Sequence, residues 1–379
     1  MRNGFVSGQK CFAALGLAFM VGCSSTPETA KPKTLADIDK PLPVKELGRF
    51  GTAAADSYVF QPAVVGKAIF VAGANGDVQR YEDGREIWRI GLDQRLSGGV
   101  AANDQMLVVG GLKGNVIALS PMDGKLLWQS AVGAEIAAPA ALLDDMVVVR
   151  TGDNRLLGLD RQSGQRKWTY QRTVPPLSVR VVSAPVVADR LVFTGFPGGK
   201  LVAVNTQTGQ AVWEGTVALP KGSTELERIS DVVAAPIIGA KEVCAAAHQG
   251  RLACFDLNNG TLLWARDVSV SNAIVMDNKA VYVADDQGIV QAFDRTTGGT
   301  LWKQEKLINR RLSGPMISRG YLVLTDDQGM LHVMDREDGA FRGRFNLQAG
   351  RVESELRSVE SNVIFQTDKG LLMTMQVDQ

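Results

Sequence analysis

The chain has 379 residues, and its 41 Lys and Arg residues nearly balance its 40 Asp and Glu residues, which leaves a formal net charge of +1. Nucleic-acid binding relies on a concentrated basic surface that releases the counterions of phosphates, so this balance argues against nucleic acid as the main ligand. The sequence contains only two histidines, His248 and His332. A metal site or an acid–base pair built on histidine is therefore not expected.

Residues 1–22 have the pattern of a signal peptide. Arg2 and Lys10 precede the apolar run CFAALGLAFMV. This run is much shorter than the roughly 20 residues that a helix needs to cross the hydrocarbon core of a bilayer. The pattern therefore predicts a cleaved signal and not a transmembrane helix.

The end of this segment, Met20-Val21-Gly22-Cys23, resembles the lipobox of bacterial lipoproteins, with Met in the place of the usual Leu. The resemblance implies cleavage before Cys23 and acylation of that cysteine, and several acyl chains anchor a protein stably. Ser24 is not the Asp that retains many lipoproteins in the inner membrane, so we expect a lipid anchor in the outer membrane, facing the periplasm. The alternative is an ordinary signal peptide followed by an incidental cysteine.

Residues 23–43, which follow, are rich in Pro, Lys, Asp and Thr and contain few apolar side chains. Such a composition buries too little apolar surface to offset the entropy of ordering. We therefore predict that the lipidated cysteine is joined to the folded body by a flexible tether.

From about residue 44 to residue 379 the sequence repeats a hairpin pattern. A β-rich run, a tight turn and a strand with alternating apolar residues recur, as in KGNVIAL and QGRLACF. Asn replaces glycine at one turn, and Asn is the residue that best tolerates a left-handed turn conformation after glycine. The turn residues are Gly76, Gly114, Asn154, Gly199, Gly250, Gly288, Gly329 and Gly370.

Every tryptophan of the chain falls at one phase of this repeat, 12 or 14 residues after a turn residue, in motifs such as DGKLLW. A seventh copy, DGAFRG, has Gly343 in this position. A large ring at the same point of each repeat is explained by packing between neighbouring sheets, without a cofactor. The six are Trp88, Trp128, Trp168, Trp213, Trp264 and Trp302.

Small residues or proline open the hairpins, as at Gly98-Gly99 and Ala138-Pro139, which fits strands that crowd towards a central axis. Four strands in each unit of about 40 residues are typical of a β-propeller. The chain has eight hairpin turns but only seven closing strands, and the segment Lys45–Thr52 has no partner before the first hairpin. We therefore predict an all-β, eight-bladed propeller of four-stranded antiparallel blades over residues 44–379. Pairing of the N- and C-terminal strands would close the ring and remove two exposed edges; the main alternative has seven blades and a spare hairpin.

Cys244 and Cys254 flank one hairpin turn at nearly equal distances. In an oxidising compartment they would face each other across the hairpin and form a disulfide. The spacing of opposed strands works against such a bond, because it requires Cβ atoms about 3.8 Å apart. Two buried free thiols are the equal alternative.

The repeat resembles that of the quinone-dependent dehydrogenase propellers, which implies features that can be sought in this sequence. Those enzymes carry two adjacent cysteines beside the quinone, a calcium site, a catalytic Asp and large insertions. Here the cysteines are not adjacent and most connections are short. Carboxylates such as Asp285 and Asp326 stand before glycine turns, where Asp commonly bonds its own backbone. Because a fold alone carries no chemistry, we expect no enzymatic activity, no cofactor and no metal, with a quinone-dependent dehydrogenase as the alternative. A small ligand in the central channel stays an open possibility.

Two connections break the regular spacing. From the closing Trp to the next proline or the residue in its place, Trp168–Pro185 spans 17 residues and Trp213–Pro236 spans 23, against 10 to 13 elsewhere. Both connect an outer strand to the next inner strand in neighbouring blades, so we expect both on one face of the disc. Apolar residues with charged neighbours, as in PPLSVR and ELERISD, are typical of a protein-docking site. The alternative is that the apolar residues pack beneath their own loops.

The lipobox, the eight repeats, PPLSVR and STELERISD together resemble the BamB family, the lipoprotein subunits of the outer-membrane β-barrel assembly machine. The resemblance covers the whole mature chain. It implies a scaffold that binds the periplasmic POTRA domains of the central barrel subunit, BamA, and assists nascent outer-membrane proteins. Val233 stands where the family has a second Asp, which puts any salt bridge at that position in doubt. The partner-binding residues expected from the resemblance and the loop charges are Leu177, Val179, Arg180, Arg228 and Asp231.

Overall fold

The computed structural model describes residues 1, 4, 31–180, 182–352 and 354–378. The chain divides into two units, Met1–Lys31 and Pro32–Gln379, and the second contains the propeller. Cys23 and nearly all of the predicted signal peptide lie outside the described residues. No helix in the described ranges is long and apolar enough to cross a membrane.

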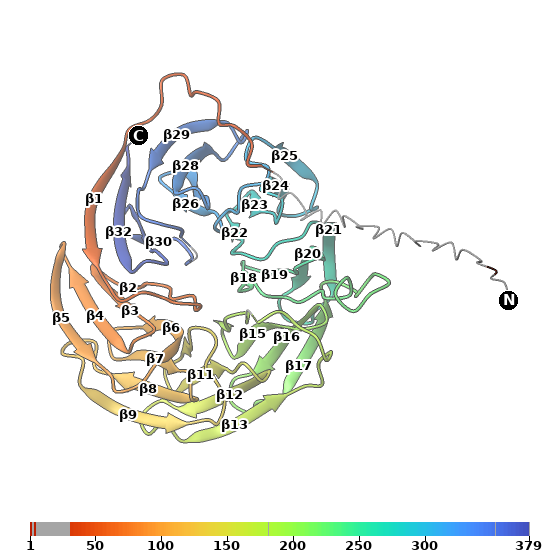
Figure 1. The fold of residues 1–379 in the computed structure, drawn as a ribbon. Helices are drawn as coiled ribbons and strands as arrows, with labels where there is room; N and C mark the ends of the chain where they lie inside the picture. The colour runs from red at the N-terminus through yellow and green to blue at the C-terminus, as the bar shows by residue number, and fades with distance from the viewer. Residues whose placement is uncertain (2–3, 5–30, 181, 353, 379) are drawn as a thin grey trace. The chain divides into compact units, whose positions relative to one another are not determined.

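The described part of Pro32–Gln379 folds into eight four-stranded antiparallel sheets arranged as the blades of a ring (Figure 1). This confirms the predicted all-β, eight-bladed propeller. In blades 1 to 7 the first strand in sequence lies nearest the central opening and the fourth lies outermost. The strands of blades 1 to 4 are β2 (Ala63–Val65), β3 (Ala68–Ala72), β4 (Asp77–Glu82) and β5 (Arg85–Gly91); β6 (Leu96–Ala102), β7 (Leu107–Gly111), β8 (Asn115–Leu119) and β9 (Leu126–Ala131); β10 (Ala141–Leu142), β11 (Met146–Arg150), β12 (Arg155–Asp160) and β13 (Arg166–Gln171); β14 (Val186–Ala188), β15 (Leu191–Phe196), β16 (Lys200–Asn205) and β17 (Ala211–Thr216).

Blades 5 to 8 continue the pattern around the ring, and the last blade takes its outer strand from the N-terminal end of the propeller. Their strands are β18 (Ile237–Ile238), β19 (Glu242–Ala246), β20 (Arg251–Asp256) and β21 (Leu262–Asp267); β22 (Val275–Met276), β23 (Ala280–Ala284), β24 (Val290–Asp294) and β25 (Thr300–Gln304); β26 (Met316–Ser318), β27 (Tyr321–Thr325), β28 (Met330–Asp335) and β29 (Phe341–Asn346); β30 (Arg357–Val359), β31 (Asn362–Gln366), β32 (Leu371–Val377) and β1 (Val44–Gly51).

The hydrophobic core lies mainly between adjacent blades. Val108 and Val116 of blade 2, for example, pack in one buried cluster with Val147 and Leu157 of blade 3. The alternation of apolar residues along the two middle strands supplies one face to each neighbouring blade. Each blade is therefore buried on both faces, and its stability depends on the blades beside it.

The constant position of the tryptophans within the repeat has a structural cause. Each indole N–H donates a hydrogen bond to a backbone carbonyl in the next blade; Trp128 Nε1, for example, lies 2.7 Å from the Arg161 oxygen. The ring also packs on a turn glycine of that blade, and a Cβ at Gly164 would come within 2.4 Å of Trp128. The same hydrogen bond is made by Trp88, Trp168, Trp213, Trp264 and Trp302.

The turn residues adopt the left-handed conformation that the sequence pattern predicts, with one exception, and small residues line the central axis as expected. Asn154 adopts a left-handed backbone (φ 67°), as its place in the repeat predicts, whereas at the fifth turn Gln249 (φ 49°), and not Gly250, takes this conformation. Near the axis, a Cβ on Gly99 would lie 3.0 Å from the Pro139 ring and 3.2 Å from the Gln61 nitrogen. Small residues are therefore required where the inner strands converge.

The ring closes by pairing the two ends of the propeller. β1 is antiparallel to β32, from Val44 opposite Val377 to Gly51 opposite Leu371. The predicted pairing of the N- and C-terminal strands is thus confirmed. β1 covers the outer edge of β32 and so completes the sheet that β30, β31 and β32 begin.

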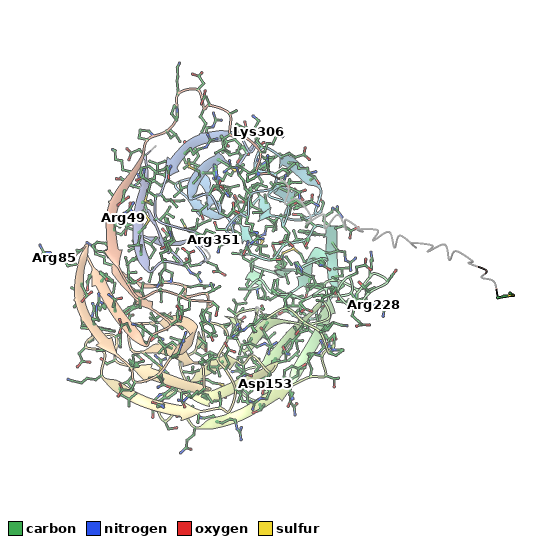
Figure 2. All side chains as sticks on the ribbon, in the orientation of Figure 1. Arg49, Arg85, Asp153, Arg228, Lys306 and Arg351 are labelled. Atoms are coloured by element: carbon green, nitrogen blue, oxygen red, sulfur yellow. A yellow bond between two sulfur atoms is a disulfide. The ribbon has the colours of Figure 1, made fainter. Side chains whose placement is uncertain are left out.

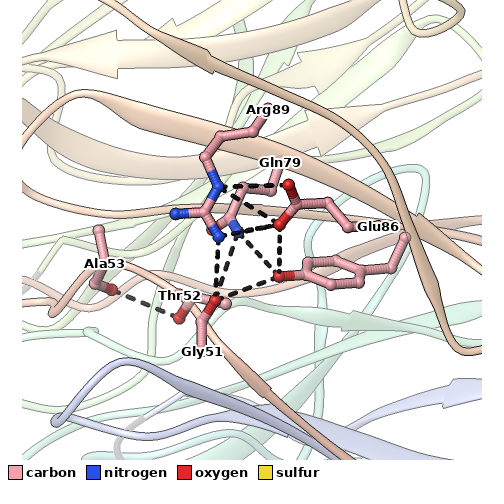
Figure 3. A network of polar contacts seen from close by, with 7 residues as sticks. Gly51, Thr52, Ala53, Gln79, Glu86 and Arg89 are labelled. Atoms are coloured by element: carbon pink, nitrogen blue, oxygen red, sulfur yellow. Dashed lines mark hydrogen bonds and ion pairs between the residues drawn. The ribbon is translucent and has the colours of Figure 1, made fainter.

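A polar network fastens the end of β1 to blade 1 (Figure 3). The Gly51 carbonyl accepts hydrogen bonds from Gln79 Nε2 at 3.4 Å and from the Tyr81 hydroxyl at 3.2 Å. Glu86 Oε2 is the other acceptor within reach of the Tyr81 hydroxyl, at 3.3 Å, and it pairs with Arg89 at 2.8 Å. Burial raises the pKa of Tyr81 to about 12, so its hydroxyl remains a donor at neutral pH.

Residues 32–43, which the composition assigns to the flexible tether, lie along blade 7. The Lys33 nitrogen donates to the Ile308 carbonyl at 3.0 Å, and Arg344 donates to the Ala36 carbonyl at 3.1 Å. Leu35 packs against the core between blades 6 and 7. The few apolar side chains of this part of the tether thus find partners on the propeller.

The same segment explains the missing tryptophan of blade 7. A Cβ on Gly343 would lie 3.1 Å from the Leu42 carbonyl oxygen and 3.5 Å from a methyl carbon of Val44. The Leu42 nitrogen donates to the Arg342 carbonyl at 2.6 Å, which holds the chain against β29. The N-terminal segment occupies the space that an indole fills in blades 1 to 6.

Cys244 and Cys254 form a disulfide in blade 5. They stand directly opposite each other in the pairing of β19 with β20, and both are fully buried. Of the two alternatives that the sequence leaves open, the structure contains the bonded one. The bond fixes the hairpin whose turn contacts the long loop described next.

Candidate functional site

The two long connections lie together on one face of the ring. We call residues 172–185, between β13 and β14, loop one, and residues 217–236, between β17 and β18, loop two. The backbone nitrogen of Val179 in loop one donates a hydrogen bond of 2.7 Å to Asp231 Oδ2 in loop two. The interruptions of the repeat, one between blades 3 and 4 and the other between blades 4 and 5, thus meet in a single surface.

Asp231 is the residue that joins the two loops. Only 2% of its surface is exposed, and its other carboxylate oxygen accepts the backbone N–H of Gly198 at 3.0 Å. Its carbonyl oxygen accepts the backbone N–H of His248 at 2.9 Å. Asp231 was expected to contact a partner directly, but its side chain is buried and both oxygens are occupied. Its place in the structure is that of a positioning residue, because a buried carboxylate needs these N–H donors to offset desolvation.

The apolar side chains of the loops remain on the surface. Leu177 is 45% exposed, and Val179 beside Asp231 is half-buried. Loop two adds Leu219 and Leu226, which are more exposed than Leu177. These two leucines were missed in the sequence, although apolar residues in a connection rich in charges are the signal that singled out Leu177. Val233, the departure from the family pattern, is buried.

Arg180 extends towards the central opening. Its NH2 lies 3.6 Å from Glu135 Oε1, and its guanidinium carbon lies 5.4 Å from the centre of the Tyr58 ring. Tyr58 stands 122 residues earlier in the chain, and its hydroxyl oxygen is 3.5 Å from the same NH2. Neither Glu135 nor Tyr58 has a sequence signal of function, because only the ring brings blades 1, 3 and 4 together here.

Arg228 belongs to a compact turn in loop two (Figure 2). Its Nε donates to the Gly222 carbonyl at 3.1 Å, and NH1 lies 3.6 Å from Glu225. Glu227 accepts the backbone N–H groups of Ser223 and Thr224, and these hydrogen bonds lower its pKa. These contacts hold the turn in a compact conformation, and Leu226 is exposed on it. The exposed Arg228 follows two residues later in the sequence.

A cavity of about 370 Å³ lies beneath loop one, with Arg150, Glu135 and Asp231 in its lining. Arg150 is buried, and its guanidinium carbon lies 4.0 Å from the centre of the Phe196 ring. Burial lowers the pKa of Arg150 to about 9. Its hydrogen bonds go to backbone carbonyls and to Asn154, so this arginine braces the junction of blades 3 and 4.

The carboxylates before the glycine turns have the structural role expected of them. Asp285 Oδ1 accepts the N–H groups of Gln287 and Ile289, and Asp326 Oδ1 accepts those of Gln328 and Met330. Within the described ranges, no group of three or more His, Cys, Asp or Glu side chains is arranged to hold a metal ion.

The arrangement at loops one and two suits non-covalent docking, with exposed apolar side chains beside charged ones.

Comparisons with known proteins agree with this architecture. The family model described as outer membrane protein assembly factor BamB matches residues 74–304 and 286–379. The outer membrane protein assembly factor BamB of Nitrosomonas eutropha is 41% identical over 331 residues, which cover 86% of this chain and 81% of that protein. The protein of the same name from Burkholderia pseudomallei is 37% identical over 90% of both chains.

Solved structures give the same answer for the fold. The crystal structure of BamB from Moraxella catarrhalis matches with a TM-score of 0.82 at 27% identity, covering 88% of this chain and all of that one. A quinohemoprotein alcohol dehydrogenase from Comamonas testosteroni matches with a TM-score of 0.69 at 12% identity, covering 89% of this chain and 78% of the enzyme, a likeness of fold alone. The chain belongs to the BamB family of outer membrane protein assembly factors.

Proposed function

We propose that this protein is a non-enzymatic scaffold of the outer-membrane β-barrel assembly complex. In this proposal Cys23 carries the lipid anchor in the outer membrane, and the propeller faces the periplasm. Loops one and two bind the POTRA domains of a BamA-type barrel subunit, and the complex assists insertion of nascent outer-membrane proteins. Family membership supports the assembly role, and the joined loops supply a surface for it.

The observation that carries the proposal is the shared surface of loops one and two. Leu177, Leu219 and Leu226 are exposed there, while the buried Asp231 fixes the two loops to each other. A fixed apolar surface with charges at its rim loses little entropy on binding, and it gains from the water that it excludes. Leu177 and Arg180 are therefore the residues that we assign to the contact, with Val179, Arg228 and Asp231 shaping it.

Nascent barrel strands have a second possible contact on this molecule. The outer strands of several blades have one unpaired edge and expose apolar side chains, among them Leu127 of β9 and Leu263 of β21. An extended client segment would bind such an edge by adding a strand. This supports the proposed handling of nascent outer-membrane proteins, although each edge is short.

Co-purification with BamA from solubilised outer membranes tests the docking proposal. We expect Leu177→Ala to weaken the association about ten-fold, because apolar anchors dominate such interfaces. The melting temperature should stay unchanged, since Leu177 is 45% exposed. Leu301→Ala on β25 is the matched control, because Leu301 is also 45% exposed and lies on another blade.

The control variant should retain BamA at the level of the unmodified protein. Equal retention of BamA by Leu177→Ala, Arg180→Ala and Leu301→Ala would place the docking surface elsewhere. A lowered melting temperature for Leu177→Ala would show that this leucine supports the fold, and the assignment of loop one would then fail.

A further inference from the structure

A third loop reaches the mouth of the central channel opposite loops one and two. This first-blade loop, residues 52–62, connects β1 to β2. Ala55 and Phe60 are buried in the core between blades 1 and 2 and anchor it at two points. Asp56 pairs with Arg95 at 2.5 Å and braces the loop against the start of blade 2. Val59 stays exposed between these anchors.

The first-blade loop shares a cavity with the candidate docking surface. A hollow of about 410 Å³ at the channel mouth is lined by Tyr58 and Val59 of the first-blade loop, Glu135 of blade 3 and Arg180 of loop one. Tyr58 is partly buried and packs against the core below it. The ring of Tyr58 is therefore held in place by its own blade, independently of Arg180.

The guanidinium of Arg180 is held in one orientation, but some of its N–H groups have no acceptor among the described residues. Its NH2 is the group that lies near Tyr58 and Glu135. Among the described residues, nothing accepts a hydrogen bond from its Nε or NH1, which leaves these two N–H donor groups free to bind a carboxylate of a partner. The two existing contacts are long and exposed, so each is weak. Their effect is to restrict the rotamers of a long side chain before any partner arrives.

We propose that Tyr58 is a positioning residue for Arg180, and that the first-blade loop forms the third wall of the docking surface. This inference rests on the proposed function. Tyr58 holds the guanidinium plane at the channel mouth, so that an N–H group still free on it meets an acidic side chain of the partner protein. Val59, which lines the same hollow as Arg180, provides an apolar contact beside that acidic side chain. Immobilising a rotamer-rich side chain in advance lowers the entropy lost on binding.

The test compares dissociation constants of the full-length lipoprotein for full-length BamA of the same organism, both in detergent. Tyr58→Ala removes both ring and hydroxyl and should weaken binding about three- to ten-fold. Tyr58→Phe keeps the ring and should weaken binding about two-fold. Tyr321→Phe in blade 7 is the matched control for loss of a hydroxyl and should bind as the unmodified protein does.

Coupling to Arg180 separates a positioning role from a structural one. If Tyr58 acts through Arg180, adding Tyr58→Ala or Tyr58→Phe to Arg180→Ala causes no further loss of affinity. A loss that adds fully to that of Arg180→Ala overturns the proposal, and so does wild-type affinity of Tyr58→Ala. In the event that Tyr58→Ala does not fold, the cycle with Tyr58→Phe decides the question.

Leu177→Ala, measured beside these variants, distinguishes the two levels of the proposal. Weak binding of Leu177→Ala together with wild-type binding of Tyr58→Ala overturns the role of the first-blade loop and leaves the proposed function standing. Wild-type binding of Leu177→Ala and Arg180→Ala overturns the docking of BamA at loops one and two on which the proposed function rests, and the assignment of Tyr58 falls with it.

Discussion

Asp231 illustrates how a buried residue can shape the proposed docking surface. Its carboxylate accepts the backbone N–H groups of Val179 and Gly198, so it ties loop one and the β15–β16 turn to loop two. Burial makes these hydrogen bonds important, because an unpaired N–H in a buried place loses its water without compensation. We therefore expect both the stability of the two loops and their binding of a partner to depend on the Asp231 side chain.

Replacing Asp231 should separate this role from that of Leu177. We expect Asp231→Ala to lower the free energy of unfolding by about 1–3 kcal/mol, because two partly buried N–H groups lose their acceptor. Asp231→Asn should lose less, since one carbonyl oxygen remains. Chemical denaturation measures both, with Asp327→Ala as a control, because Asp327 is only partly buried and accepts a hydrogen bond from the side chain of the neighbouring Gln328.

The same variants should differ in binding. Asp231→Ala should weaken association with BamA and lower stability together, whereas Leu177→Ala should weaken association alone. Unchanged stability of Asp231→Ala would mean that the loops are held by other contacts, and the assigned positioning role would then be abandoned.

At the scale of elements, the β19–β20 hairpin supports loop two from below. Its strands are joined by the Cys244–Cys254 disulfide, and its turn carries His248, whose backbone N–H binds the Asp231 carbonyl. The His248 ring lies 3.1 Å from Asp286 Oδ2 and 2.8 Å from the Ser271 hydroxyl. The turn thus connects loop two to blade 6 through a titratable side chain.

The hairpin turn should make stability depend on pH in a definite direction. The hydrogen bond with Asp286 raises the pKa of His248 above its ordinary value of 6.5. Burial disfavours the charged form of Asp286, but hydrogen bonds from His248 and Ser269 lower its pKa. A raised histidine pKa contributes stability that is complete below pH 6.5 and is lost as the pH rises through the folded value.

We therefore expect His248→Gln to lower the melting temperature more at pH 5.5 than at pH 9. His332 is present in both proteins, so its own titration cancels in the comparison. Thermal unfolding of both proteins at the two pH values checks this. An equal difference at both would show that the protonated ring adds nothing to the contact with Asp286.

At the scale of the molecule, closure by β1 determines whether the ring is complete. β1 covers the edge of β32, and Gly51 at its end joins the network of Gln79 and Tyr81 in blade 1. Leu42, just before β1, also covers the place of a tryptophan in blade 7. One segment thus connects three blades across the seam.

Removal of β1 should therefore cost more than removal of the chain before it. We expect a protein lacking residues 24–51 to melt at least about 5 °C lower than the unmodified protein and to self-associate through the exposed edge of β32. A protein lacking only residues 24–31 is the control and should melt like the unmodified one. Calorimetry and light scattering measure the two effects; equal melting of both deletions would mean that the ring is stable without its closing strand.

The sequence by itself determined the blades, the ring closure and the position of the two long loops. The blades are repeated at fixed spacing, and each copy forms from local residues: glycine or Asn154 in a turn, alternating apolar side chains in strands, a tryptophan that packs on the next blade. The residues of the candidate surface on loops one and two, such as Leu177 and Arg180, could be selected because they interrupt that spacing.

Only the tertiary structure decided what those residues contact. Asp231 is buried because three separate segments converge on it, and Arg180 meets Tyr58 because the ring returns the first-blade loop to the channel mouth. Gly343 replaces a tryptophan because Leu42 passes over it. Such contacts join residues far apart in the chain, and no local pattern records them, since they depend on where the closed ring places each loop.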